Sequence, residues 1–444
     1  IASGATTSGM GRTGTVDWQT TPKTATFTAV SGEGYFCNTS GGAFEVDLPA
    51  GSAGAIVSVQ DYNNSFDNNN LTIDPNGSEK INGGDGGYPL TLSTEGQGIT
   101  LVYIDSTVGW RSVHSDDFSQ VPQTPVYMAA SGGTPSTCGD YKIHTFTSPG
   151  TFTVSAVGNN AGSDAVEVLG VAAGGGGGGC NGGGGGAGAV ASNSAVTLTA
   201  TGYPITIGAG GTAGPAAGGD GSTGTAITFF SNTIRAGGGG KGADSPGSMG
   251  GTFSNGGGGA GVADSVPYAQ ASYKYCGVAH PTISGYTIGA GNNGGAGRND
   301  STPPNPGPGN LAGGGAGSGA VGVSAPSPTQ AGNGGVGTLN AINGSSLYWG
   351  GGGGGGTNNG TAGDGGNGGG GGGGGSPGAG NGGSGGAGLN AGSAGANGPP
   401  SAGGAGGSAG ANTGGGGGGA GRSSSSNGGT GGSGIVIIKY KFQN

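Results

Sequence analysis

Short apolar segments separated by turn-forming residues recur along the first quarter of the chain. Between residues 25 and 118 these segments are rich in β-branched and aromatic residues, and Gly, Asn, Pro and Asp lie between them. Short strands at regular spacing are typical of a small antiparallel β-sandwich or an intertwined trimeric β-module. The expected strands cover residues 25–30, 34–38, 43–48, 55–61, 71–73, 90–93, 99–104 and 110–113.

A second set of apolar segments begins near residue 141, after an expected linker at 119–140 that holds several Pro and Gly residues. Residues 142–147 and 151–154 flank the turn sequence Ser148-Pro149-Gly150, which predicts a hairpin. Residues 1–24 have no such pattern and are expected to form an irregular lead-in. Further strands are predicted at 165–173, 195–201, 203–207, 226–230 and 434–442.

The last of these segments, residues 434–442, is almost continuously apolar and must therefore be buried. Its expected partners lie in residues 141–230, although about 200 mostly glycine-rich residues separate it from them. The pattern predicts one domain over 141–444. In this domain, residues 141–230 and 434–442 form a β frame, and residues 231–433 are a long insertion between two of its strands.

Glycine accounts for 125 of the 444 residues and is concentrated in tracts such as 350–356 and 368–375. These tracts break the strict three-residue period of collagen. Flexible linker is the alternative that such a composition leaves open. The framing strands favour packed polyglycine II, an extended threefold helix that rises about 3.1 Å per residue without internal hydrogen bonds. Glycine lets such helices approach closely and bond to one another in three directions. We therefore predict an all-β protein with almost no α-helix and a polyglycine II bundle.

Charge and composition exclude several classes of function. The formal net charge is −9, and no basic cluster offers the electrostatic footprint of a nucleic-acid-binding protein. No run of 18 apolar residues predicts a membrane span. We expect a processed chain or a fragment, because the sequence begins at Ile1. The cysteines are widely spaced and form no CxxC pair, so we expect no metal site.

Catalytic chemistry has few candidates. Glycoside hydrolysis needs two convergent carboxylates. The adjacent pair Asp116 and Asp117 is the strongest candidate, yet a solvated turn explains it better. Residues 61–70 are rich in Asp and Asn but lack the Gly and Glu of an EF-hand loop, which favours a turn. His144 lies in a predicted strand, where a structural role is favoured. We expect no enzyme, no catalytic residue, no metal and no cofactor.

Segments richer in side chains interrupt the glycine tracts at 264–292, 298–311, 321–349 and 422–427 and are expected to be loops at the bundle ends. Tyrosine and tryptophan are common anchors at binding hot spots. The alternative is that they plug the rims of a bundle that has few other apolar groups, and we favour plugging for Tyr348 and Trp349. The candidate receptor-binding residues are Tyr268, Tyr273, Lys274, Tyr275, His280, Tyr286, Tyr348 and Trp349.

Four ordered motifs carry a resemblance to a known family. The hairpin sequence 146–152, the strand 166–173 that enters poly-Gly, the motif 203–211 and the closing motif 431–440 together resemble the glycine-rich domain of bacteriophage tail fibres. The stretch from Val16 to Trp110 is similar to β-modules of marine phage fibres, including those of cyanophages. The glycine-rich domain of some receptor tyrosine kinases is also similar, since such helices project there from a β-sandwich.

The resemblance to phage adhesins implies a non-enzymatic fibre segment in the virion whose loops bind a host receptor, either a polysaccharide or an outer-membrane protein. It also implies contacts with other tail-fibre proteins and a homotrimer, without nucleic acid or membrane insertion. A purely structural extracellular fibre and a polysaccharide-degrading tailspike are the competing interpretations.

Overall fold

The computed structural model describes residues 16–113, 122–234, 241–242, 255–260, 280–289, 291–298, 310–358, 360–376, 381–399, 402–422 and 426–444. Within these ranges every regular element is a β-strand and none is a helix, which confirms the predicted all-β class. The chain divides into two compact units, Ile1–Val126 and Tyr127–Asn444. Each unit is described below by itself.

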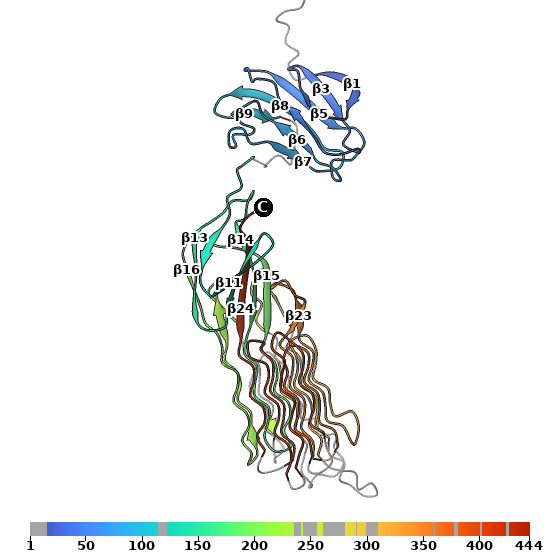
Figure 1. Ribbon diagram of the computed structural model, residues 1–444, viewed down its shortest axis with the longest axis vertical. Coiled ribbons are helices and arrows are strands. Elements are labelled where there is room, and N and C mark those ends of the chain that lie inside the picture. Colours follow the sequence, from blue (N-terminus) through green and yellow to red (C-terminus); the bar gives the residue numbers. More distant parts are fainter. Residues whose placement is uncertain are drawn as a thin grey trace, which may run out of the picture. The chain divides into compact units, whose positions relative to one another are not determined.

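The N-terminal unit consists of two sheets, and the chain passes from one to the other after each of its first strands (Figure 1). One sheet has the order β1-β3-β5-β8-β9, and the other has the order β2-β4-β6-β7. The strands are β1 (Asp17–Lys23), β2 (Phe27–Thr28), β3 (Glu33–Cys37), β4 (Phe44–Asp47), β5 (Ile56–Asp61), β6 (Leu71–Asp74), β7 (Leu90–Leu92), β8 (Gly98–Asp105) and β9 (Gly109–Ser112).

This alternation makes the first strands of each sheet parallel, so the expectation of an antiparallel sandwich is wrong for β1 to β6. Strand β3 pairs in parallel with β1 and β5, and β4 pairs in parallel with β2 and β6. Each strand lies beside the strand two earlier because the intervening one belongs to the other sheet. Only the later pairs, β5–β8, β8–β9 and β6–β7, are antiparallel.

The expected irregular lead-in is also wrong over β1. Its sequence is mostly polar, so it lacks an apolar pattern, and Pro22 is tolerated because β1 is an edge strand. Trp18 on β1 packs against Phe36 on β3, with ring centroids 4.9 Å apart. Tertiary pairing, rather than local pattern, makes this segment a strand.

The frame of the C-terminal unit is a six-stranded sheet with the order β11-β12-β24-β14-β15-β21 and a three-stranded sheet with the order β10-β13-β16. Its strands are β10 (Ala129–Ser131), β11 (Thr134–Cys138), β12 (Tyr141–Phe146), β13 (Gly150–Ala156), β14 (Ala165–Val171), β15 (Val190–Thr197), β16 (Gly202–Ile205), β21 (Thr287–Ile288) and β24 (Ile435–Lys441). Strands β10 and β11 lie within residues 119–140, so this range is not simply a linker.

The closing strand β24 lies between β12 and β14 and is antiparallel to both. Its partners thus lie within residues 141–230, as the sequence predicts. Both of its faces are buried. Val436 and Ile438 pack in a core that includes Phe152 of the smaller sheet. Ile435 and Ile437 pack in a second core with Trp349. Burial on both faces explains why the strand is continuously apolar.

The predicted hairpin at residues 142–154 does not form. Strands β12 and β13 belong to different sheets: β12 pairs with β11 and β24, whereas β13 pairs with β10 and β16. The turn sequence Ser148-Pro149-Gly150 instead takes the chain from one layer to the other. The remaining short strands are β17 (Gly219–Asp220), β18 (Ile227–Phe229), β19 (Asn232–Ile234), β20 (Lys241–Gly242), β22 (Thr338–Asn340) and β23 (Leu347–Trp349).

Glycine tracts extend from this frame as parallel rods (Figure 1), and their hydrogen bonds repeat every three residues. The amides of Gly174 and Gly177 donate to Gly432 and Gly429. Those of Gly175 and Gly178 donate to Gly186 and Gly183. Those of Gly176 and Gly179 donate to Ser222 and Gly219. Successive amides thus point to three different neighbours, which is the bonding pattern of packed polyglycine II.

An interior rod is bonded on all sides. The amides of residues 351–356 donate to three segments, and their carbonyl groups accept from three others. The donor bonds reach residues 368–371, 332–335 and 182–185, whereas the acceptor bonds come from residues 312–315, 363–366 and 416–419. Six bonded neighbours give the bundle a backbone network in place of an apolar core. One of these neighbours, residues 332–335, lies inside the predicted loop 321–349, which is therefore not a single end loop.

His144 has the structural role that its strand position predicts. It is 1% exposed, its Nδ1 lies 2.7 Å from the Gly132 carbonyl oxygen, and its Nε2 lies 3.3 Å from the Tyr440 hydroxyl. Burial lowers the pKa of His144 below its ordinary value of 6.5.

The stability of the C-terminal unit is therefore expected to depend on pH through His144. The unfolded chain binds a proton near pH 6.5, whereas native His144 binds it only at lower pH. The contribution of His144 is fully present above pH about 6.5 and decreases as the pH falls toward the native pKa. Urea unfolding at several pH values should show a weaker acid dependence for His144→Gln than for the wild type. Identical dependence would contradict this assignment.

Candidate recognition surface

The aromatic segment that the sequence singles out is only partly placed. Tyr268, Tyr273, Lys274 and Tyr275 lie outside the residues that the structure describes, as do Asp116 and Asp117. Their assignment stays a prediction. The described candidates are His280, Tyr286, Tyr348 and Trp349.

His280 and Tyr286 are held against the frame. The His280 Nε2 lies 3.2 Å from the carbonyl oxygen of Thr233 on β19, and its Nδ1 lies 2.7 Å from that of Pro281. The Tyr286 ring lies 5.9 Å from that of Phe229 on β18, and burial raises the pKa of Tyr286. Tyr286 thus packs at the border of the frame core, while His280 remains half-buried beside β19.

Tyr348 and Trp349 point to opposite sides of the β22–β23 hairpin. Trp349 is fully buried and packs with Val171, Ile435 and Ile437 of the six-stranded sheet. Tyr348 is 37% exposed and pairs across the hairpin with Leu339, which is 55% exposed. The prediction that Trp349 contacts a receptor is therefore wrong. Trp349 instead plugs the base of the bundle, which is the alternative that the sequence analysis favours for this residue. Tyr348 stays available at the surface.

The rods turn at the end of the bundle that lies away from the frame (Figure 1). Thr357 ends the rod 351–356, the Arg422 amide donates to its carbonyl oxygen, and the Arg422 guanidinium reaches the Asn358 side chain at 3.4 Å. Nearby chain segments bring Asn181 and Asn310 to the same end, since the Asn181 amide bonds to Gly421 and the Asn310 carbonyl oxygen accepts from Asn358.

Asn310 and Arg422 lie in the segments 298–311 and 422–427 that the sequence predicts as end loops, whereas sequence reasoning missed Asn181, which interrupts a glycine tract. Asn181, Asn310 and Ser376 are each at least nine-tenths buried, and each has a side-chain oxygen that makes no hydrogen bond within the structure. The only signal in the sequence is that a polar residue interrupts or ends a glycine tract. Polar side chains thus lie at several rod ends, while the interior rod 351–356 consists of glycine alone.

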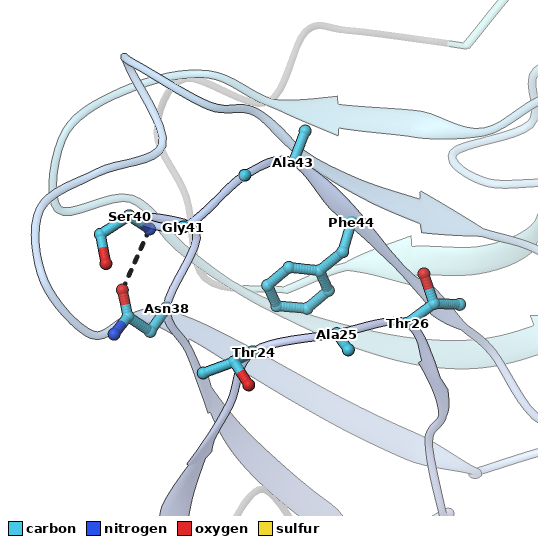
Figure 2. Close-up of a pocket in the computed structure, with 9 residues that line it drawn as sticks. Thr24, Ala25, Thr26, Asn38, Ser40, Gly41, Ala43 and Phe44 are labelled. Atoms are coloured by element: carbon cyan, nitrogen blue, oxygen red, sulfur yellow. Dashed lines mark hydrogen bonds between the residues drawn. The ribbon is translucent and has the colours of Figure 1, made fainter.

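The N-terminal unit carries an open hollow of about 470 Å³ beside β4 (Figure 2). Its polar groups are hydroxyls and one amide, and Phe44 forms part of its wall. The Asn38 Oδ1 accepts from the Ser40 amide at 3.1 Å. No charged residue lines this hollow. Its lining residues are Thr24, Ala25, Thr26, Asn38, Ser40, Gly41, Gly42, Ala43 and Phe44.

Comparison with known families agrees with the rods and their frame. Residues 147–408 match the glycine-rich domain family, which is more than half of the chain. The chain belongs to this family. No curated protein matches the sequence. The match begins just before β13 and covers most of the bundle, so the glycine-rich domain is the part of the C-terminal unit that defines the family.

Among the described residues of this glycine-rich domain protein, no group of three or more His, Cys, Asp or Glu side chains is arranged to hold a metal ion. The Asp61 carboxylate instead accepts hydrogen bonds from the amides of Asn63, Ser65, Phe66 and Gly96, which confirms the turn predicted at residues 61–70. No described helix is long and apolar enough to span a membrane.

Proposed function

We propose that this protein is a non-enzymatic segment of a phage tail fibre that presents receptor-binding loops on a rigid glycine-rich scaffold. One observation carries the proposal: the interior of the bundle is held by backbone hydrogen bonds, and polar residues such as Thr357, Asn358 and Arg422 lie where its rods end. Loop sequences can then change without disturbing the scaffold, as recognition of varied hosts requires. The resemblance of the sequence to phage fibre motifs supports the same function.

The partner that fits this proposal is a host surface molecule, either a polysaccharide or an outer-membrane protein. Tyr273 and Tyr275 lie in the aromatic-richest segment of the glycine region, and tyrosine supplies rigid contact area at binding sites. The protein would act in the virion, in contact with other tail-fibre proteins.

Replacing both Tyr273 and Tyr275 with Ala is expected to weaken adsorption to host cells about tenfold or more. A truncated tyrosine anchor typically costs about 2 kcal/mol of binding free energy. The measurement is adsorption of the purified protein to host cells, together with its melting temperature. Tyr62→Ala is the matched control, because Tyr62 is 55% exposed in the N-terminal unit. Full adsorption by the folded double variant would remove this segment from the receptor site.

Assembly gives a second test. Virion fibres are commonly trimers, and β1 is an edge strand of its sheet, to which another chain could pair. We therefore propose a homotrimer that is intertwined through residues 1–118. Light scattering of the full chain at micromolar concentration is expected to give three times the mass of 40.7 kDa. A monomer under these conditions would contradict the proposed trimer.

Two competing functions make different predictions. A purely structural fibre would assemble but would not bind host cells or their surface extracts. A tailspike would release reducing sugars from the host polysaccharide, for which it needs two convergent carboxylates. Binding without sugar release supports the proposed function over both.

A further inference from the structure

Within the described residues, one outer rod of the bundle, residues 391–398, is bonded on three sides. The Gly395 amide donates to Gly383 at 2.9 Å, the Ser393 amide donates to Ser408 at 2.8 Å, and the Ser393 carbonyl oxygen accepts from Gly372 at 2.9 Å. The interior rod 351–356 has six bonded neighbours. This outer rod therefore has three sides on which a further polyglycine II helix could pack.

The vacant sides carry backbone groups with no hydrogen bond inside the described part of the chain. The amides of Ala391 and Ala394, three residues apart, donate to nothing there. The carbonyl groups of Ala391 and Ala394 likewise accept nothing there. Ala391 and Ala394 are both exposed. Unpaired backbone groups in a regular row are a template for another chain, as at the edge of a β-sheet.

Nothing in the sequence protects this edge. Residues 381–412 contain no charged residue, and Gly, Ala, Ser and Asn make up nearly all of them. Another outer segment, residues 319–325, differs in this respect, because Val321 and Val323 are 58% and 43% exposed. Branched side chains there hold a second backbone away, whereas Ala391 and Ala394 allow close approach.

We propose that the 391–398 edge pairs with the same edge of a second copy of this chain. The occupant must present free amides and carbonyl groups at a three-residue spacing without bulky side chains. The edge itself meets this requirement, since it carries both kinds of group. Two copies also meet no charge repulsion there. This contact is separate from receptor binding. It is also separate from the trimer proposed for residues 1–118 and would occur in addition to it.

Sedimentation of the full chain over a range of concentrations tests this pairing. The expected association is weak, because so short an edge buries less than the standard interface area of about 1,600 Å². Ala391→Lys with Ala394→Lys is expected to weaken it about tenfold or more, since like charges would face each other. Val321→Lys with Val323→Lys is the matched control and should associate as the wild type does. Equal association of all three proteins would overturn the proposal.

A cysteine at the edge identifies the contact directly. Ala394→Cys is expected to form a disulfide between copies under mild oxidation, and peptide mapping should join position 394 of both chains. Val321→Cys should not form the corresponding link. Failure of Ala394→Cys to link, or linking at both positions alike, would overturn the pairing. Binding of an added proline-rich peptide in place of self-association would also overturn it, because the occupant would then be another chain.

Discussion

Replacing Gly353 or Gly371 with Val is expected to lower the free energy of unfolding of the glycine-rich unit by about 3 kcal/mol or more. A Cβ placed on Gly353 would collide with the carbonyl oxygen of Gly417, and one on Gly371 would collide with that of Gly407. These obstacles are backbone atoms held by their own hydrogen bonds, so the rods must separate. Overpacking of a rigid interior typically costs about 1–3 kcal/mol, and each Val adds three carbons here.

Chemical denaturation of each variant beside the wild type measures this effect. Ala394→Val is the matched control, because it also adds a branched side chain to the bundle but at an exposed position of an outer rod. The control should lose about 0.5 kcal/mol at most. If the Gly353 and Gly371 variants unfolded like the wild type, the tracts would have to be flexible linkers instead of packed helices.

Replacing Trp349 with Ala is expected to cost about 3–5 kcal/mol of stability, the range for truncating a large buried aromatic side chain. Trp349 is fully buried between the β22–β23 hairpin and the six-stranded sheet, where it contacts the closing strand β24. Its loss would leave a cavity at the place where the bundle joins the frame. Since the bundle has few other apolar groups, the surrounding backbone cannot easily collapse to fill that cavity.

The neighbouring residue provides the control. Tyr348→Ala removes an aromatic side chain of similar size from the exposed side of the same hairpin. It should change stability by less than about 1 kcal/mol. Thermal unfolding of both variants would compare them. A smaller loss for Trp349→Ala than for Tyr348→Ala would contradict the assignment of Trp349 as a plug.

The strands of both units were predictable where an apolar segment lies between turn residues. Strands β3, β5 and β8 fall within a residue or two of the expected ranges. The pairing of strands was not predictable in the same way. Local sequence does not state which sheet a strand joins, so the parallel pairs β1–β3 and β2–β4 were missed, and the turn Ser148-Pro149-Gly150 was taken for a hairpin.

For the candidate recognition residues, too, the sequence predicted one part and the tertiary structure decided the other. The sequence indicated that aromatic residues interrupt the glycine tracts, and it left open whether they bind a receptor or plug the bundle. The hairpin register decided the matter for one pair, because neighbouring residues on a strand point to opposite faces. Trp349 faces the frame core, and Tyr348 faces outward. For Tyr286 the deciding contact is with Phe229, which lies more than fifty residues earlier in the chain.

The sequence by itself determined the all-β class, the closing strand β24 and the polyglycine II character of the tracts. Each of these depends on residue type alone: β-branched residues suit strands, a wholly apolar strand must be buried, and only residues without Cβ atoms pack this closely. The tertiary structure decided which rods are neighbours and which edge is left open. Every glycine tract offers the same backbone groups, so only the path of the chain selects the interior rod 351–356 and the exposed rod 391–398.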